Sequence, residues 1–402
     1  MGVTLTLKDT DLPTSPAFVE FLHTDLTGGE FYAGSWHAQD EESLASNEGR
    51  FENLGEKITF VLSKPEGRQR VLQSYRYFKE MLTGRPDTIK TIQRYRFFFV
   101  IGIPRTGGTY MTKQLFRGAG MDYRKVQNAL AHDGFPHLGT LAFQEQGGNI
   151  HTSGLLQLAE YLTMVDVYFT KYGRLAYNGG IVVPKKFTKG VYSFPLIHEV
   201  IGNNAEYIIT LRHPLAMIQS VLDKSGGMPK GGIFTVRSAI ERWAMDDWMK
   251  WGVAEALVKK MSYIDVFLGY WKRYHYQIAM EAIPTMAATH LLPYGRAHMM
   301  GAVKKFYEGF GTNLEAESFK EAPKPDFGAK ENQKGDAVVQ QVAAFWKSLG
   351  LTFPLMNPTC PPRFVRHRFT ASDFSLSTAS STLENSSSCL EDHLDGVAGA
   401  RL

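Results

Sequence analysis

Three short apolar runs mark the chain, each bounded by glycine, proline or charged residues. They cover residues 94–104 (RYRFFFVIGIP), 179–187 (GGIVVPKKF) and 206–214 (EYIITLRHP). A continuous apolar run of this length is typical of a strand that is buried on both faces of a parallel sheet. The pattern therefore predicts three strands of one mostly parallel sheet.

Between these runs, apolar residues recur at helical spacing. Helical patterns cover residues 67–84, 109–120, 151–176, 194–202 and 214–224, and others fill 236–310 and 336–350. The charged stretch 329–336 (AKENQKGD) is predicted to be a solvated loop, with a flexible lid as the alternative. Strands that alternate with helices predict an α/β fold, a three-layer sandwich around a mostly parallel central sheet.

The pattern also divides the chain. Residues 1–90 are mixed and polar and predict a largely helical N-terminal extension, and residues 91–356 carry the α/β alternation. Residues 357–402 are rich in Ser and Thr and show little periodicity. That composition predicts a disordered tail, because it offers too little apolar surface to form a core.

Composition narrows the class of protein. The 402 residues are 44% hydrophobic and 21% charged, with a formal net charge of +4. This small charge, without clustered basic stripes, argues against a nucleic-acid partner. The start has neither the basic nor the apolar region of a signal peptide, and the longest apolar runs are too short for a membrane span, so we expect a cytoplasmic protein. The two cysteines and the lack of a His/Cys cluster predict no disulfide framework and no metal site.

The first strand leads into a stretch that resembles a phosphate-binding P-loop with one part missing. Gly102, Gly107 and Thr109 have the P-loop spacing, but Gly108 stands where the lysine belongs. The cation is inside the loop instead, as Arg105, beside the hydroxyl groups of Thr106 and Thr109. The strand–loop–helix order predicts a P-loop-like phosphate-binding loop that has lost the part specific for a triphosphate and its metal.

A second cationic motif follows another predicted strand. Arg212 ends the run EYIITL, and Ser220 follows eight positions later on the next predicted helix. Arginine binds phosphate through two parallel hydrogen bonds, so Arg212 with Ser220 predicts a second anion site. A basic strand end also lacks the acid that a magnesium-dependent nucleotide site needs.

Together the two motifs resemble those of the PAPS-dependent sulfotransferases, most closely the bacterial type. These enzymes transfer a sulfuryl group from 3′-phosphoadenosine 5′-phosphosulfate (PAPS) to an acceptor. The resemblance covers roughly residues 95–350, and Arg212 and Ser220 match the family's 3′-phosphate motif. The family's 5′-phosphosulfate loop is matched in order by Pro104, Arg105, Thr106, Gly107, Gly108 and Thr109, with Tyr110 next.

The resemblance implies roles for these residues. It implies that Arg105 stabilises charge on the leaving oxygen, and that Lys185 or Lys186 matches the family's strand lysine, of which we take Lys185 as the one that contacts the sulfuryl group. The two lysines point to opposite faces of an extended strand, so one of them is expected to reach the site. The acceptor is predicted to be a hydroxyl or amine of a small molecule or carbohydrate, and no metal is expected.

The acceptor also requires a base. We take His132 as that base, because it follows the loop helix in a turn-rich stretch expected at the carboxyl edge of the sheet, where ligands bind. Asp133, His137 and His151 are the other candidates.

Two alternative functions stay open from the sequence. One is an atypical P-loop kinase or other NTPase. The other is a non-catalytic nucleotide-binding module, favoured by Gly295, which replaces the glutamate that bacterial sulfotransferases carry after the residue matched by Tyr294.

Overall fold

In the computed structural model, the described residues are 14–31, 53–84, 90–132, 152–173, 176–286, 288–322 and 327–356, and all of them belong to one compact unit. The predicted tail at 357–402, with both cysteines, lies outside this set, as do three of the candidate bases, Asp133, His137 and His151. The domain boundaries at residues 90 and 356 stay predictions.

Within the described part of the chain, the sheet has five strands in the order β2-β3-β1-β4-β5. β3, β1, β4 and β5 are parallel, and β2 pairs with β3 as an antiparallel edge strand. The predicted mostly parallel α/β sheet is therefore confirmed. The strands are β1 (Tyr95–Ile101), β2 (Ala176–Tyr177), β3 (Gly180–Lys186), β4 (Ala205–Leu211) and β5 (Thr289–Pro293).

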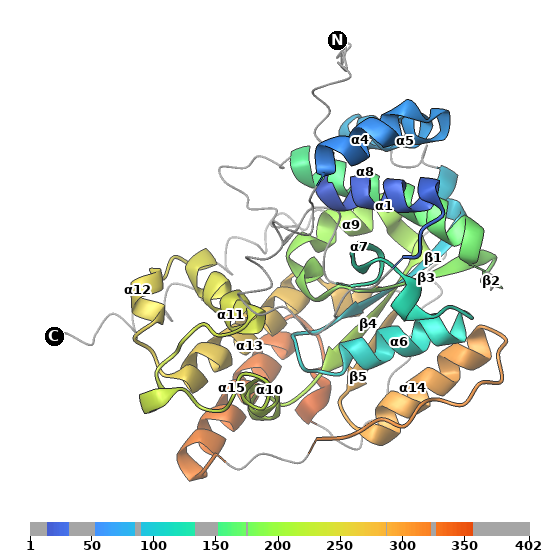
Figure 1. Ribbon diagram of the computed structural model, residues 1–402. Coiled ribbons are helices and arrows are strands. Elements are labelled where there is room, and N and C mark those ends of the chain that lie inside the picture. The colour runs from blue at the N-terminus through green and yellow to red at the C-terminus, as the bar shows by residue number, and fades with distance from the viewer. Residues whose placement is uncertain are drawn as a thin grey trace. The chain divides into compact units, whose positions relative to one another are not determined.

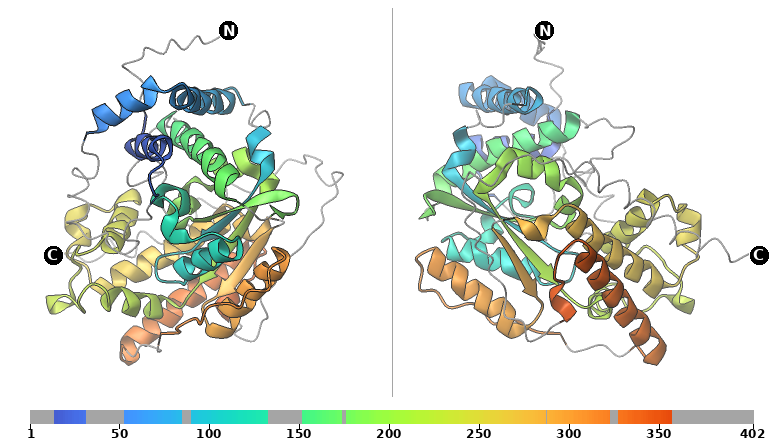
Figure 2. Two further views of the ribbon diagram at one scale, coloured as in Figure 1. Left: turned by 45° about the vertical axis from the view of Figure 1, so that its right-hand side comes forward. Right: turned by 180° about the vertical axis from the view of Figure 1, so that it is seen from behind.

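Helices cover both faces of the sheet (Figures 1 and 2). On one face lie α6 (Gly108–Gly118) and α14 (Arg296–Gly309). On the other lie α7 (Asn128–Ala131), α8 (Thr152–Tyr172) and α9 (Phe194–Ile201). Outside α8 lie the N-terminal helices α1 (Pro16–Thr27), α4 (Leu54–Ser63) and α5 (Pro65–Leu82).

A second group of helices lies beyond the carboxyl ends of the strands (Figure 1). It consists of α10 (Pro214–Leu222), α11 (Ala239–Lys250), α12 (Glu255–Val258), α13 (Tyr263–Met280) and α15 (Ala329–Ser348). The stretch 329–336 forms the first turns of α15, so its prediction as a loop or lid is wrong. No helix among the described residues is both long enough and apolar enough to cross a membrane.

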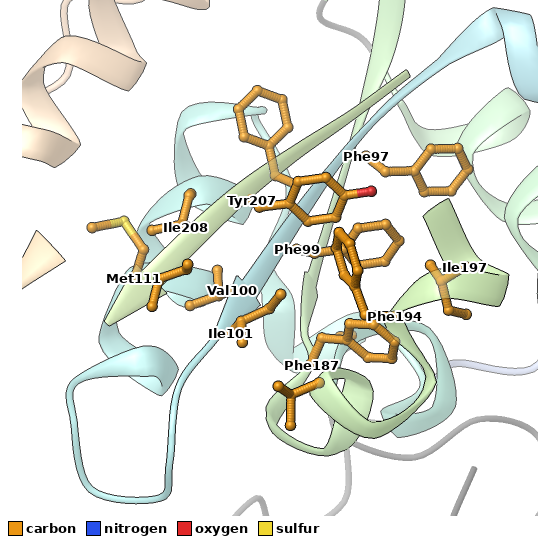
Figure 3. Close-up of a cluster of buried hydrophobic side chains, with 14 of the residues drawn as sticks. Phe97, Phe99, Val100, Ile101, Met111, Phe187, Phe194, Ile197, Tyr207 and Ile208 are labelled. Carbon is orange, nitrogen blue, oxygen red and sulfur yellow. The ribbon is translucent and has the colours of Figure 1, made fainter. Parts of the chain in front are cut away.

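The alternation of side chains along β1 explains why this strand is apolar throughout. Phe98 packs edge-on against Phe306 and Phe310, next to α14. Phe97 and Phe99 point to the opposite face, where Phe99 contacts Phe187 and Tyr207 (Figure 3). Because both faces of the strand are covered, both sets of side chains must be apolar. This packing fixes the carboxyl end of β1, from which the candidate loop begins.

Candidate functional site

Residues 102–107 connect β1 to α6 in the strand–loop–helix order that the sequence predicted. Gly102 has no room for a side chain, because a Cβ atom there would lie 2.1 Å from the Oγ1 of Thr210. Gly107 has a φ of 95°, and a Cβ atom there would lie 2.7 Å from the Cε of Met299. Both glycines are therefore required by the tight path of the loop.

Arg105 lies at the turn of the loop in a left-handed backbone conformation, with a φ of 73°. For a residue with a Cβ atom this conformation is strained, and it persists only where the surroundings hold it. Two contacts hold it here. Arg212 Nη1 donates to the carbonyl oxygen of Arg105 at 2.9 Å, and Arg105 Nε donates to Ser220 Oγ at 3.0 Å.

The two anion motifs predicted from the sequence are thus in direct contact with each other. Arg212 is 4% exposed, and its guanidinium lies 4.0 Å from the centre of the Tyr294 ring. Its buried Nε has no hydrogen-bond partner among the described residues. Burial lowers the pKa of Arg212 from its ordinary value. The hydrogen bonds of Arg212 and Ser220 therefore fix the position of Arg105 in the loop.

The remaining loop residues differ in what their side chains do. Thr106 Oγ1 is buried and donates to the carbonyl of Ile103 at 2.7 Å, with the hydroxyl of Thr210 also 2.7 Å away. Tyr110 donates from its hydroxyl to the carbonyl of Glu317 at 2.6 Å. These two side chains support the loop and α6. Gly108 begins α6, so its backbone N–H belongs to the helix end that attracts anions.

A cavity of about 460 Å³ lies beside the loop, within the size range of small-molecule sites. Four of its lining residues are cationic and, among the described residues, none is acidic. Arg212 and Ser220 are not among them. The described residues that line it are Pro104, Arg105, Thr109, His132, Lys186, Val221, Lys224, Ser225, Arg237, Ser238, Ala239, Ile240 and Trp243.

The two lysines at the end of β3 point to opposite sides, as expected. Lys186 lines the cavity, and its Nζ lies 3.4 Å from His132 Nε2. Lys185 is fully buried and donates to the carbonyl oxygens of Ala129 at 2.8 Å and His132 at 2.7 Å. The structure therefore places Lys186 on the cavity wall, where the sequence analysis had assigned Lys185.

His132 also lines the cavity and is 5% exposed. It follows the short helix α7, and its backbone N–H donates to the carbonyl of Asn128 at 2.8 Å. The imidazole, Lys186 and Arg105 thus belong to one cavity wall, although they come from three different parts of the chain.

The cations of the site raise each other's electrostatic energy. Burial lowers the pKa of Arg105, and the charge of Arg212 lowers it further. The pKa of Lys224 is lowered by burial and then by Arg105, Lys186 and Lys113. A bound anion would relieve this repulsion, because each nearby negative charge favours the charged form of these groups. The arrangement is therefore suited to an anionic ligand.

The sequence analysis did not predict that Lys224, Ser225 and Arg237 line the cavity. Lys224 and Ser225 follow α10, and Arg237 and Trp243 come from the start of the α11 region. Arg237 Nη2 lies 3.0 Å from the buried Oε1 of Glu241, so its charge is partly neutralised. Among the described residues, no group of three or more His, Cys, Asp or Glu side chains is placed to hold a metal ion.

The fold and the site define an α/β protein with a basic cavity at the carboxyl edge of its parallel strands. No protein-family model, curated protein or solved structure matches the chain. The function is therefore argued from the residues of the cavity.

Proposed function

We propose that this protein binds PAPS and transfers its sulfuryl group to a hydroxyl or amine of a small-molecule or carbohydrate acceptor. One observation carries the proposal. The cavity beside the strand–loop–helix turn is lined by Arg105, Lys186, Lys224 and Arg237, with no acid among its described lining residues. A site of this charge favours a ligand with several negative charges.

The loop wall fits the phosphosulfate end of the donor. Arg105 and Lys186 supply positive charge, Thr109 supplies a hydroxyl, and the N-terminus of α6 supplies backbone N–H groups. Arg105 stabilises the charge that develops on the phosphate oxygen when the sulfur–oxygen bond breaks. Lys186 takes the role of binding the sulfuryl oxygens.

The acceptor forms the new bond to sulfur as the bond from sulfur to the phosphate oxygen breaks. The acceptor loses a proton in this step, and His132 is the group that we propose receives it, on its imidazole ring. Lys186 Nζ lies 3.4 Å from His132 Nε2, so the base and the sulfuryl-binding cation are neighbours. Adenosine 3′,5′-bisphosphate and the sulfated acceptor are the products.

Arg212 and Ser220 are proposed to bind the 3′-phosphate of the donor. The buried Nε–H of Arg212 makes no hydrogen bond among the described residues and can donate one to a phosphate oxygen. Ser220 Oγ accepts a hydrogen bond from Arg105, and the hydroxyl group of Ser220 can donate its own proton to the 3′-phosphate. Neither side chain lines the cavity, so in this proposal the 3′-phosphate is the part of the donor that lies outside it.

The test is calorimetric titration with adenosine 3′,5′-bisphosphate, without magnesium. We expect binding by the unmodified protein. Lys186→Met should weaken it about 30-fold, since a buried charged hydrogen bond contributes about 2 kcal/mol. Lys224→Ala should weaken it about fivefold, because this lysine is exposed to solvent. The matched control is Lys230→Ala, which removes an exposed lysine outside the cavity lining and should change nothing.

The alternatives predict different results. Magnesium-dependent binding of ATP in preference to the bisphosphate would identify a P-loop kinase or NTPase. Tight binding of the bisphosphate without sulfate transfer to any member of a broad acceptor panel would identify a non-catalytic nucleotide-binding module. Equal affinity in the unmodified protein, Lys186→Met and Lys224→Ala would remove the cavity as the binding site.

A further inference from the structure

The ammonium group of Lys185 is buried at the end of β3, away from the candidate cavity. Its side chain is fully buried, and its Nζ lies 4.9 Å from the centre of the Tyr161 ring on α8. It donates to two main-chain carbonyl oxygens, those of Ala129 and His132. A buried ammonium is costly unless it is hydrogen-bonded, so these contacts are what keep the charge at this position.

Both carbonyl groups belong to the end of α7. The last carbonyls of a helix have no partner within the helix and carry partial negative charge, so a cation satisfies them well. α7 contains four residues and cannot hold its own end firmly. The ammonium of Lys185 therefore fixes the main chain at the point where His132 leaves the helix.

His132 is held at three atoms. Its N–H donates to Asn128, its carbonyl accepts from Lys185, and its Nε2 lies 3.4 Å from Lys186. Lys185 and Lys186 are adjacent on β3, so one strand end holds the main chain of His132 with one lysine and contacts its ring with the next. The sheet itself thereby determines where the imidazole lies in the cavity.

We propose that Lys185 is a positioning residue that holds His132 in place for proton transfer. This inference rests on the proposed function, in which His132 is the base. Lys185 acts through the main chain and does not contact the substrate. Removing its ammonium leaves the cavity cations in place but frees the end of α7, so the base loses its alignment while the nucleotide site is kept.

The experiment uses the full chain with Lys185→Met, which keeps the length of the side chain and removes the donors. We expect kcat for sulfate transfer to fall about 100-fold, the effect of misplacing a reacting group by about 1 Å. The KM for PAPS and the affinity for adenosine 3′,5′-bisphosphate should stay within about threefold of those of the unmodified protein. Lys186→Met should differ from Lys185→Met in nucleotide affinity, because it removes a cation that lines the cavity and should weaken nucleotide binding.

A second measurement is independent of activity. The ring ¹³C–¹H signal of His132, assigned from its absence in His132→Asn, should move in Lys185→Met and stay in place in Lys230→Ala. If Lys185→Met does not fold, Lys185→Gln takes its place, because its amide can still donate to one carbonyl. The glutamine variant should then show a displaced His132 signal and a fall in kcat of less than 100-fold, because one of the two hydrogen bonds is kept.

The outcomes separate this inference from the proposed function. An unmodified protein without sulfate transfer would overturn the proposed function, and the His132 signal would still decide whether Lys185 positions the ring. An unchanged His132 signal in the variant would overturn the positioning role. So would a kcat equal to that of the unmodified protein, or a loss of nucleotide affinity as large as the loss in kcat.

Discussion

Replacing Glu160 by glutamine should remove one contribution to this protein's stability that is lost as the pH rises. Glu160 lies on α8 and is fully buried. Its carboxylate accepts hydrogen bonds from the backbone N–H of Ser15, at 2.9 Å, and from the Ser15 hydroxyl. Ser15 immediately precedes α1, so this contact fixes the start of the first helix to α8 across 145 residues of sequence.

Burial raises the pKa of Glu160 from 4.5 to about 7, against the opposing effect of the Ser15 hydrogen bonds. Below about pH 4.5 the carboxyl is protonated in both the folded and the unfolded chain. Between pH 4.5 and 7 the unfolded chain releases the proton while the folded protein keeps it, so the contribution of Glu160 to stability falls as the pH rises. The total loss is about 3 kcal/mol.

Glutamine has the same shape and does not ionise, and its amide can accept from the Ser15 N–H and donate to the Ser15 hydroxyl. The free energy of unfolding of Glu160→Gln relative to that of the unmodified protein, measured by urea titration from about pH 4.5 to 8, should therefore rise by about 3 kcal/mol over the range. Glu199→Gln, at an exposed position on α9, is the matched control and should follow the unmodified protein. Parallel curves for the unmodified protein and Glu160→Gln would refute the reasoning.

Three further predictions follow from single residues. Arg105→Gly should weaken binding of adenosine 3′,5′-bisphosphate at least tenfold in calorimetry, because it removes a cation from the site. The loss of stability should stay under about 1 kcal/mol, because glycine adopts the left-handed backbone conformation at φ 73° without strain. Gly102→Ala should lower the thermal midpoint strongly because its Cβ would meet Thr210, whereas Gly108→Ala, with its nearest atoms at 3.6 Å, should be tolerated. Burial lowers the pKa of His275 from 6.5 to about 4, so its contribution to stability, about 3 kcal/mol, should be lost as the pH falls through this range. In urea titrations, His275→Phe should remove this dependence of the free energy of unfolding on pH.

The sequence predicted the central strands well and the outer strands poorly. β1, β3 and β4 lie within the predicted runs, because a strand covered on both faces must be apolar throughout and is bounded by breaking residues. β5 was missed. It has five residues, THLLP, of which Leu292 and Thr289 are the buried ones, and it lies between helices whose pattern hides it. β2 has two residues and no pattern of its own.

For the site, spacing identified Arg105, Arg212 and Ser220, because the loop and the strand end have recognisable chemistry. Spacing did not place them relative to each other, since their contacts cross more than a hundred residues. The sequence analysis chose Lys185 over Lys186, whereas the structure places Lys186 in the cavity lining. Strand alternation separates the two faces, but the position of α7 decides which lysine meets the cavity and which meets a helix end. The cavity-lining residues that follow α10 and that precede α11 belong to no motif, so the sequence did not identify them.

The contacts of Arg105 have a consequence for how mutations combine. Arg212 fixes its main chain and Ser220 fixes its side chain, so either loss releases the same group. Once one loss has released Arg105, losing the second contact changes the position of Arg105 little more. In a double-mutant cycle on nucleotide affinity, the part of each loss that acts through Arg105 should therefore count only once, so Arg212→Ala and Ser220→Ala together should cost less than the sum of the single changes. Selection would act on these three positions, 105, 212 and 220, as a single unit.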